Sequence, residues 1–571
     1  MASPPLATDD WVRCTGCGEL VYRRRLDRLL KVCPDCGHHF RLRAREWLDL
    51  LVDSGSGVRF GEEVVPEDVL GFVDSKPYPE RIAEGRRRSG NSAAALCATA
   101  RIDGVPIVIA ALDFAFLGGS IGGAVGELIS RAARHALKDR VPLLIVSASG
   151  GARMQEGAIA LMQLAKTSQE MARLHAAGVL VVNLNTDPTY GGASASFAML
   201  GDVIIAEPGA RIGFAGPEVI RQTIRQELPD RFQTAEFLWE NGQIDLVVPR
   251  EELRTVLSRL LRLHSLAARP GLRPVVSGDT AHAGDTPVTD PALLPERDPA
   301  EIVALARDLG RPTTRDYCAY VFDDFLELHG DRQGGDDPAI VGGLARLDGR
   351  TVVAIGHQKG HEVGELVRRN FGMPQPWGYH KAHRLMDYAA RFGLPLVTFV
   401  DTPGAYPGIE AEQRGQAYAI ARCIMRMSEL PVPVVCVVTG EGGSGGALAL
   451  AVGNRVLILE NSYFSVISPE GCSTILFGDR SAAQRAAEQL RLTPRDLLRL
   501  GIVDGVLKEP GDGAHTQHTA TAQRVKAALV QTLDELSELQ PSQLVDQRYQ
   551  RYARFGDPKL RLTKGLGHGG D

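Results

Sequence analysis

The sequence predicts an α/β protein with two related large domains in tandem, preceded by a small cysteine-rich module. Strand-like runs followed by glycine turns occur in the same pattern twice, and short β-branched runs alternate with longer amphipathic ones. Two Cys-x-x-Cys pairs stand near the N-terminus. Alternation of this kind is typical of parallel α/β sheets. Two copies this long indicate duplicated domains, because solenoid repeats are far shorter.

The cysteine-rich module covers residues 11–45. Its two Cys-x-x-Cys pairs lie 15 residues apart and comprise Cys14, Cys17, Cys33 and Cys36. This spacing is typical of a zinc ribbon, in which four thiolates complete a closed tetrahedral site. A closed site indicates one structural zinc per chain. His38 and His39 follow the second pair, and we expect neither to bind the metal because four cysteines suffice.

The module is also basic. Residues 11–45 contain nine Lys or Arg and three Asp or Glu, a net charge of +6. A basic ribbon can contact nucleic acid or a phosphorylated ligand. We favour a solvated face or a lid over an anionic ligand, and we keep nucleic-acid binding as an alternative role.

Bulk composition restricts the class of protein. The chain has 571 residues, a formal net charge of −5 and nine cysteines, five of them scattered. No apolar run reaches the 18 or so residues of a membrane span, and Met1–Pro5 does not begin a secretory signal. Scattered cysteines fit a reducing compartment. We therefore expect a cytoplasmic protein with no membrane contact.

The two large domains are expected at 46–265 and 299–550. A Pro-, Gly- and Asp-rich linker is expected at 266–298 and a tail at 551–571. Within each domain a two-residue hairpin turn precedes the first glycine turn, at Asp103-Gly104 and Asp348-Gly349. Amphipathic patterns predict helices over 157–175 and 378–392.

Each domain carries two glycine turns directly after buried strand-like runs. They contain Gly150-Gly151 and Gly191-Gly192 in the first domain, and Gly404 and Gly445-Gly446 in the second. The turns are 41 positions apart in both domains (150 to 191, and 404 to 445), and a Pro-Glu pair follows each set, at Pro217-Glu218 and Pro469-Glu470. A strand, a glycine turn and a helix leave free N–H groups that bind anionic oxygen. Two such sites suit chemistry that forms two oxyanions.

Long stretches around these turns resemble a known family. Residues 114–120, 147–156 and 186–192, together with the ribbon, resemble the beta subunit of bacterial acetyl-CoA carboxylase carboxyltransferase. A second set of stretches resembles the alpha subunit of the same enzyme: residues 355–360, 369–374, 401–408, 440–446 and 466–471. The chain thus resembles beta and alpha fused end to end.

The resemblance implies two crotonase-like (ClpP/crotonase) domains that move a carboxyl group from carboxybiotin to acetyl-CoA, giving malonyl-CoA for fatty acid biosynthesis. Such a reaction forms a thioester enolate and a biotin ureido anion, and each set of N–H donors contributes roughly 3–4 kcal/mol. We expect Gly191 and Gly192 to bind the thioester oxygen and Gly445 and Gly446 the ureido oxygen. The residues expected to line the substrate site are Gly150, Gly151, Gly404, Gly118, Gly119 and Arg153.

The resemblance also implies partners. The chain has no Met-Lys-Met biotin attachment sequence and no P-loop, so a separate biotin carboxyl carrier protein and a biotin carboxylase are expected. The family places its active site where a beta-type domain faces an alpha-type domain across a dimer interface, which implies at least a homodimer. No side chain stands out as a general base, since the biotin ureide serves that purpose in the family.

Three alternatives stay open at this point. A related carboxyltransferase acting on propionyl-CoA would differ only in the shape of its pocket. Residues 442–446 also fit the nucleophile elbow of an α/β-hydrolase, with Ser444 as nucleophile. Nucleic-acid binding by the basic ribbon is the third.

Overall fold

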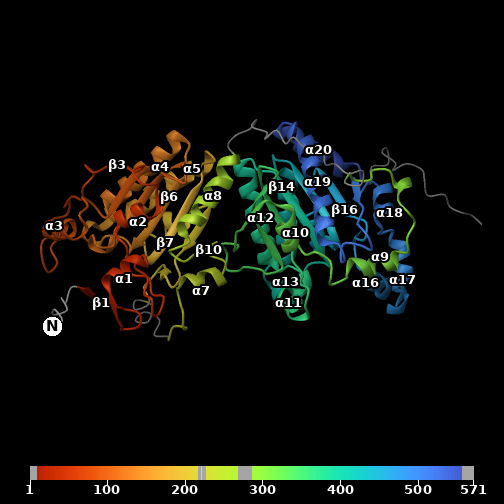
Figure 1. Ribbon diagram of the computed structural model, residues 1–571, viewed down its shortest axis with the longest axis horizontal. Helices are drawn as coiled ribbons and strands as arrows, with labels where there is room; N and C mark the ends of the chain where they lie inside the picture. The colour runs from red at the N-terminus through yellow and green to blue at the C-terminus, as the bar shows by residue number, and fades with distance from the viewer. Residues whose placement is uncertain (1–9, 217–219, 221–226, 268–285, 556–571) are drawn as a thin grey trace, which may run out of the picture. The chain divides into compact units, whose positions relative to one another are not determined.

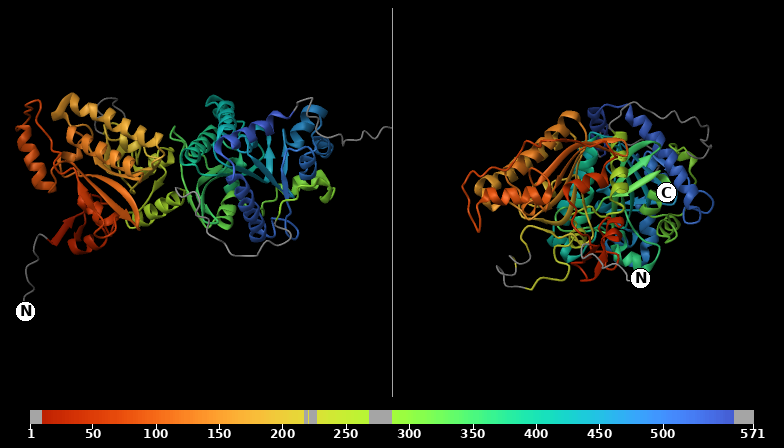
Figure 2. Two further views of the ribbon diagram at one scale, coloured as in Figure 1. Left: turned by 90° about the horizontal axis from the view of Figure 1, so that it is seen from above. Right: turned by 60° about the vertical axis from the view of Figure 1, so that its left-hand side comes forward.

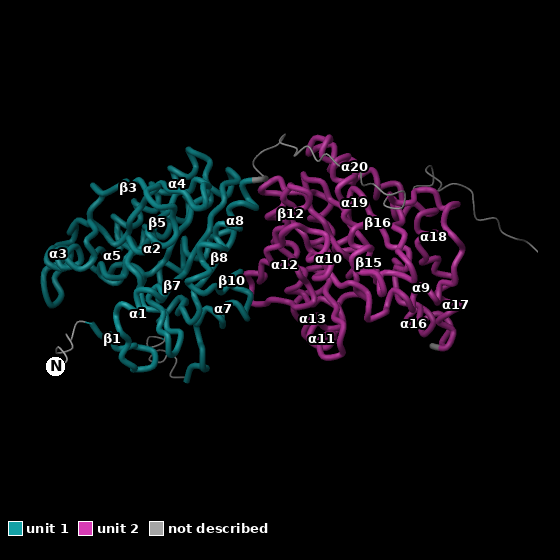
Figure 3. Tube along the Cα trace, in the orientation of Figure 1, with its two compact units in different colours: residues 1–265 teal, residues 266–571 magenta. Residues whose placement is uncertain are grey.

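The computed structural model describes residues 10–216, 220, 227–267 and 286–555. The chain divides into two compact units, residues 1–265 and 266–571 (Figure 3). Residues 268–285 of the expected linker, Met1–Pro5, Pro217-Glu218 and all of the expected tail beyond 555 lie outside the described residues. The last described helix, α20 (Pro541–Ala553), continues three residues past the expected boundary at 550.

The N-terminal module forms a small ribbon. Strands β1 (Trp11–Arg13) and β2 (Leu20–Tyr22) pair antiparallel, with Trp11 opposite Tyr22, and helix α1 (Arg23–Arg28) follows. Its core consists of Val21 and Leu26 packed with two of the cysteines. A core this small is typical of modules that depend on a metal for stability.

The sheet of unit 1 has the strand order β10-β8-β7-β6-β5-β4-β3, with β9 paired to β7. Strands β5 to β8 and β10 run parallel, whereas β3 and β4 are antiparallel to their neighbours. The strands are β3 (Val58–Phe60), β4 (Ala95–Ile102), β5 (Val105–Leu112), β6 (Leu143–Ser149), β7 (Val181–Tyr190), β8 (Val203–Ala206), β9 (Ile212–Gly213) and β10 (Leu246–Val247). Every residue of β6 is buried, as a parallel strand covered on both faces requires.

Helix α4 covers one face of this sheet. Its apolar residues pack against Val108, Ala110 and Ile145 of the central strands, and α5 lies beside it (Figure 1). The α-helices that the structure describes in unit 1 outside the ribbon are α2 (Ala44–Leu51), α3 (Tyr78–Ser89), α4 (Gly123–Asp139), α5 (Gly157–Ala176), α7 (Ala235–Glu240) and α8 (Leu253–Ala267).

Unit 2 repeats this plan. Its sheet has the order β11-β12-β13-β14-β15-β16-β18, with β17 paired to β15 and parallel strands from β13 onward. The strands are β11 (Asp324–Glu327), β12 (Ile340–Leu347), β13 (Arg350–His357), β14 (Leu396–Thr402), β15 (Val434–Gly443), β16 (Arg455–Leu459), β17 (Tyr463–Ser465) and β18 (Gly505–Leu507). Strands β14 and β15 are buried along their whole length.

Helices cover both faces of the unit 2 sheet (Figure 2). Helices α10 and α19 pack with Val397, Phe399 and Val435 on one face. Helix α12 lies on the other, where Leu385 packs against the backbone of Gly342. The helices are α9 (Pro299–Ala306), α10 (Thr314–Val321), α11 (Val363–Arg368), α12 (Pro376–Phe392), α13 (Ile409–Gln413), α14 (Gln416–Glu429), α15 (Ser444–Leu448), α16 (Pro469–Cys472), α17 (Ala483–Leu490), α18 (Pro494–Arg499), α19 (His518–Ser537) and α20.

The α/β duplication predicted from sequence is confirmed, and so are its local features. Asp103-Gly104 and Asp348-Gly349 form two-residue hairpin turns with φ of 49° and 77°, and of 48° and 75°. The helices predicted over 157–175 and 378–392 are α5 and α12. Among the described residues, no helix combines the length and apolarity needed to cross a membrane.

The sheet register refines how the two copies correspond. Ser149 lies opposite Thr189 in unit 1, and Thr402 lies opposite Gly442 in unit 2. Equivalent residues around the turns are therefore 253 positions apart (149 to 402, and 189 to 442), and not 254 as the glycine spacing suggests. Gly151 corresponds to Gly404, because both have positive φ, 113° and 148°.

Candidate functional site

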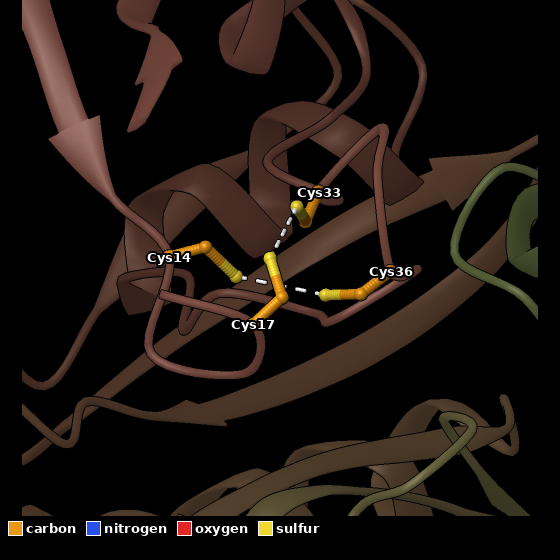
Figure 4. A group of neighbouring side chains, drawn as sticks. All are labelled: Cys14, Cys17, Cys33 and Cys36. Carbon is orange, nitrogen blue, oxygen red and sulfur yellow. Dashed lines mark hydrogen bonds between the residues drawn. The ribbon is translucent and has the colours of Figure 1, made fainter. Parts of the chain in front are cut away.

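The four predicted cysteines form a candidate metal centre. Their Sγ atoms all lie within 4.8 Å of one another (Figure 4). The Sγ atoms of Cys14 and Cys36 are 3.7 Å apart, and those of Cys17 and Cys33 are 3.9 Å apart. A tetrahedron with metal–sulfur bonds of about 2.3 Å has edges of about 3.8 Å, so the four thiols have the arrangement that zinc requires.

The knuckle turns aim these thiols inward. Gly18 and Gly37 close the two knuckles with φ of 82° and 72°, and their N–H groups bond to the carbonyls of Cys14 and Cys33 at 2.9 and 3.0 Å. His38 bonds instead to the Thr15 hydroxyl at 2.9 Å, and His39 does not belong to the cluster. All four ligand positions are supplied by sulfur, which leaves none open for catalysis.

Two arginines join the ribbon to the rest of unit 1. Arg250 is 2% exposed, pairs through two nitrogens with Glu207 at 2.6 and 2.9 Å, and donates to the carbonyls of Leu30 and Phe40. Arg41 lies 4.1 Å over the ring of Phe114 and bonds to Asp187 at 3.1 and 3.2 Å.

Asp187 lies four residues before Gly191, close to the end of β7. Through Arg41 the ribbon therefore contacts the strand that leads into the second glycine turn of unit 1.

The two glycine turns of unit 1 lie side by side at the carboxyl ends of β6 and β7, because these parallel strands are neighbours. Gly150 donates its N–H to the carbonyl of Gly118 at 2.9 Å, which brings Gly118 and Gly119 to the first turn. Gly191 has φ of 59° and bonds to Phe214. Within the described residues, the N–H of Gly192 has no hydrogen-bond acceptor and is available to a ligand.

Arg153 is placed differently from its expected role in substrate binding. Its side chain is buried, and the guanidinium donates to Ser120, to the Tyr78 hydroxyl at 3.0 Å and to Glu156 at 3.2 Å. Glu156 also accepts from Tyr78 at 2.6 Å and from the N–H of Gly123 at 2.6 Å. Arg153 and Glu156 thus hold the loop at 118–123 against the first turn, and the guanidinium has few donors left for a phosphate.

In unit 2 the corresponding turns follow β14 and β15. Gly404 donates to the Thr402 hydroxyl at 3.1 Å, as Gly151 does to Ser149 at 3.1 Å. Gly445 and Gly446 lie in the first turn of helix α15, which no side chain caps. The first N–H groups of a helix have no intrahelical acceptor, so these two are available donors.

The structure separates the glycines that packing requires from those that face open space. A Cβ on Gly446 would lie 2.4 Å from the nitrogen of Ala405, and one on Gly119 would lie 1.9 Å from the carbonyl oxygen of Ala148. A Cβ on Gly445 would instead come no closer than 3.8 Å to any atom, and one on Gly150 no closer than 3.6 Å. Only the second kind can be glycine for the sake of a ligand.

The hydrolase alternative meets only one of its requirements. Ser444 is exposed with φ of 58°, the strained geometry of a nucleophile elbow, and it occupies the position of Gly191 in unit 1. No described histidine is hydrogen-bonded to its hydroxyl. His357 lies beside Gly446, but burial lowers its pKa to about 3, which makes it a weak base for activating a serine.

A buried ionic cluster beneath the unit 2 turns was not assigned a role from the sequence. Lys359 pairs with Asp401 and Glu441, each at 2.7 Å, and Glu441 also binds Arg307 at 2.8 Å. Lys359 lies two residues past the end of β13, and Asp401 and Glu441 lie in the last residues of β14 and β15. Nothing in the sequence showed that they meet.

Comparisons with known proteins agree with this architecture. Residues 292–556 match the family described as acetyl co-enzyme A carboxylase carboxyltransferase-like, and residues 11–36 match the acetyl-CoA carboxylase zinc finger domain. A Saccharopolyspora erythraea protein named acetyl-coenzyme A carboxylase carboxyl transferase subunits beta/alpha is 63% identical over 97% of this chain and 96% of its own length. The Clostridium tetani protein of the same name is 41% identical over 96% and 93%.

Separate subunits and solved structures are also similar. The carboxyl transferase subunit alpha of Thermus thermophilus is 58% identical over 45% of this chain and 82% of its own length. The crystal structure of transcarboxylase 12S, a hexamer assembly with methylmalonyl-coenzyme A bound, has a TM-score of 0.66 at 23% identity over 89% of this chain and 92% of its own. A single-chain long-chain acyl-CoA carboxylase has a TM-score of 0.65 at 20% identity over 92% and 51%.

Proposed function

Because the chain belongs to the acetyl-CoA carboxylase carboxyltransferases whose beta and alpha parts form one polypeptide, we propose that its two pairs of glycine turns divide one reaction between them. The activity is transfer of a carboxyl group from carboxybiotin to acetyl-CoA, which forms malonyl-CoA for fatty acid biosynthesis. The relatives are named for acetyl-CoA, and neither propionyl-CoA nor nucleic-acid binding is favoured over it.

The reaction places negative charge on oxygen twice. Breaking the bond between the biotin nitrogen and the carboxyl carbon releases CO2 and leaves an electron pair shared with the ureido oxygen. The ureide then takes a proton from the α-carbon of acetyl-CoA, and the resulting enolate carries its charge on the thioester oxygen. The α-carbon attacks CO2, so biotin leaves protonated and malonyl-CoA is formed. Preorganised N–H donors lower both barriers.

One observation carries the assignment of these charges. Each unit presents an uncapped N–H group beside a strand-end turn, at Gly192 in unit 1 and at Gly445 in unit 2. Unit 1 is beta-type and unit 2 is alpha-type, so the N–H of Gly192 serves the thioester oxygen while those of Gly445 and Gly446 serve the ureido oxygen. Gly191, whose own N–H donates to the carbonyl of Phe214, shapes the turn that presents Gly192. Gly150, Gly151 and Gly404 line the walls of the two sites, and Gly118 and Gly119 support the first.

The ribbon holds one structural zinc through its four cysteines. Their sulfur–sulfur distances support this assignment, because they match the edges of a zinc tetrahedron. The metal stabilises the fold of the ribbon and takes no part in the transfer. Arg250 and Arg41 connect the metal-stabilised ribbon to the rest of unit 1 and to the end of β7.

The proposal includes partners. Biotin arrives on a separate biotin carboxyl carrier protein and is carboxylated by a biotin carboxylase, since this chain carries no sequence for either task. The chain assembles into at least a homodimer in the cytoplasm. The hexamer assembly of transcarboxylase 12S supports self-assembly, and light scattering on the purified protein measures it directly.

The reaction run in reverse tests the proposed function. Malonyl-CoA and free biotin are mixed with the zinc-loaded protein, and acetyl-CoA is measured against a reaction that lacks biotin. The proposal expects biotin-dependent formation of acetyl-CoA. Turnover of methylmalonyl-CoA but not malonyl-CoA would change the substrate, and turnover of neither by folded protein would refute the proposal.

A further inference from the structure

Three charged side chains meet beneath the glycine turns of unit 2. The Nζ atom of Lys359 lies 2.7 Å from Oδ1 of Asp401 and 2.7 Å from Oε2 of Glu441. The other oxygen of Glu441 accepts from the Tyr463 hydroxyl at 2.7 Å and from Nε of Arg307 at 2.8 Å. The side chains of Lys359, Asp401 and Glu441 are at most 14% exposed.

The cluster connects the backbone of both turns. Asp401 lies three residues before Gly404, and Glu441 lies two residues before the end of β15. Asp401 also accepts the backbone N–H of Glu441 at 2.9 Å, which joins the ends of β14 and β15 through a side chain. Gly372 makes room for Lys359, because a Cβ there would lie 2.7 Å from the Cγ atom of the lysine.

Unit 1 builds the same turns without these charges. At the shared spacing, Asp401 corresponds to Ala148 and Glu441 to Pro188. Lys359 follows β13 as Phe114 follows β5, two positions beyond the last strand residue in each case. A three-residue stretch with positive φ packs nearby in both units, at 117–119 and 370–372. The fold therefore does not need the ionic cluster, which belongs to the second site alone.

Lys359 helps to keep the Glu441 carboxylate ionised in a buried place. Lys359 and Arg307 hold the pKa of Glu441 at about 2, although burial acts to raise it. Asp401 and Glu441 raise the pKa of Lys359 against the effect of burial. The other charged groups facing the cluster are Glu470, which binds Arg307 at 2.7 Å, and the Arg311–Glu509 pair. Without the lysine, the carboxylates would repel each other.

We propose that Lys359 is a positioning residue for the second oxyanion site, holding the turns at Gly404 and Gly443–Gly446 at the spacing that carboxyl transfer requires. The inference rests on the proposed function, in which these turns serve the biotin ureido oxygen. Lys359 acts through Asp401 and Glu441, and it does not touch the substrate. A displacement of about 1 Å at such a site lowers rates by about 100-fold.

A pair of matched lysine variants tests the proposal. Lys359→Met removes the cation, and Lys381→Met is the control, because Lys381 on helix α12 is also shielded from solvent, with a side chain 1% exposed against 14% for Lys359, and pairs with Asp336 at 2.7 Å. In reverse transfer we expect Lys359→Met to lower kcat by about 100-fold with KM for malonyl-CoA unchanged, and Lys359→Arg to recover part of the rate. The control should keep kcat close to wild type.

Charge rescue and pH add readouts that general destabilisation would not move. Glu441→Gln in the Lys359→Met background removes one of the two carboxylates that repel each other and should regain at least about tenfold of the lost rate. Loss of the cation raises the pKa of Glu441 from about 2, so the deficit of the single variant should shrink as pH falls across the range in which the protein stays folded. Equal deficits across this range, with no rescue, would overturn the proposal.

Hydrogen exchange separates this inference from the proposed function. Peptides spanning 399–406 and 440–448 should exchange faster in Lys359→Met than in wild type or in Lys381→Met, whether or not the protein turns over malonyl-CoA. Unchanged exchange there, or a loss of kcat no larger than in the control, would overturn the positioning role. An inactive wild type together with faster exchange would instead refute the proposed function and leave Lys359 as the residue that orders the turns.

Discussion

Replacing Gly445 with alanine is expected to separate activity from stability. The added Cβ would lie 3.8 Å from the nearest side-chain atom, on Ile420, so no part of the fold must move. Alanine is preferred over glycine in helices by about 1 kcal/mol, and Gly445 lies in helix α15. We therefore expect Tm to stay equal or rise by about 2–4 °C.

Activity should respond in the opposite direction. The methyl group of Gly445→Ala would project into the open space where the ureido oxygen approaches the N–H donors. Losing one donor of this kind lowers rates by about 10²–10³-fold. The assay is acetyl-CoA formation from malonyl-CoA and biotin, with zinc content and Tm measured on the same sample.

Gly446→Ala is the contrasting variant. Its Cβ would lie 2.4 Å from the nitrogen of Ala405 and 2.8 Å from the carbonyl carbon of Gly404, so the backbone must shift. Overpacking of this kind costs about 1–3 kcal/mol, which lowers Tm by several degrees. The reasoning is refuted if Gly445→Ala keeps the wild-type rate, or if it loses as much stability as Gly446→Ala.

Three further predictions concern zinc, a buried ion pair and pH. Removing zinc with a chelator, or the substitution Cys33→Ser, should unfold the ribbon and lower the midpoint temperature of the first thermal transition. The far-UV circular dichroism signal of the two large sheets should persist. Arg250→Met leaves Glu207 buried without its partner, so it should cost about 3–5 kcal/mol of stability, whereas Arg250→Met with Glu207→Leu should recover most of it in thermal unfolding. Burial lowers the pKa of His357 to about 3, so unfolding takes up a proton below about pH 6.5, and the free energy of unfolding decreases by up to about 1.4 kcal/mol for each unit by which the pH is lowered. When the pH is lowered from about 7.5 to about 5.5, the Tm of His357→Phe should therefore decrease less than the Tm of the wild type. Equal decreases would contradict this.

Much of the architecture follows from local pattern. Continuous apolar runs such as Leu143–Val146 predicted strands buried on both faces, and the hairpin turns at Asp103 and Asp348 needed only the Asp-Gly signal. Four cysteines at ribbon spacing were sufficient to predict the metal centre. These features depend on residues close in sequence, where periodicity and turn chemistry act directly.

The remaining features depend on which strand ends become neighbours. Arg153 has the charge to bind a phosphate, yet Glu156 and Tyr78 surround it, and sequence order does not show that contact. The pairing of Lys359 with Asp401 and Glu441 joins residues up to 82 positions apart. The register between the two copies likewise required strand pairing, because aligning glycine with glycine shifts it by one residue.

Transfer of labelled carboxyl carbon to biotin tests the central claim most directly. Malonyl-CoA labelled at the carboxyl carbon is mixed with the zinc-loaded protein and a biotinylated carrier protein, and the carrier is then analysed by mass spectrometry. A two-oxyanion carboxyltransferase places the label on the biotin of the carrier while acetyl-CoA accumulates in equal amount. Label found only as free CO2, or a carrier that stays unlabelled while malonyl-CoA is hydrolysed, would contradict the account.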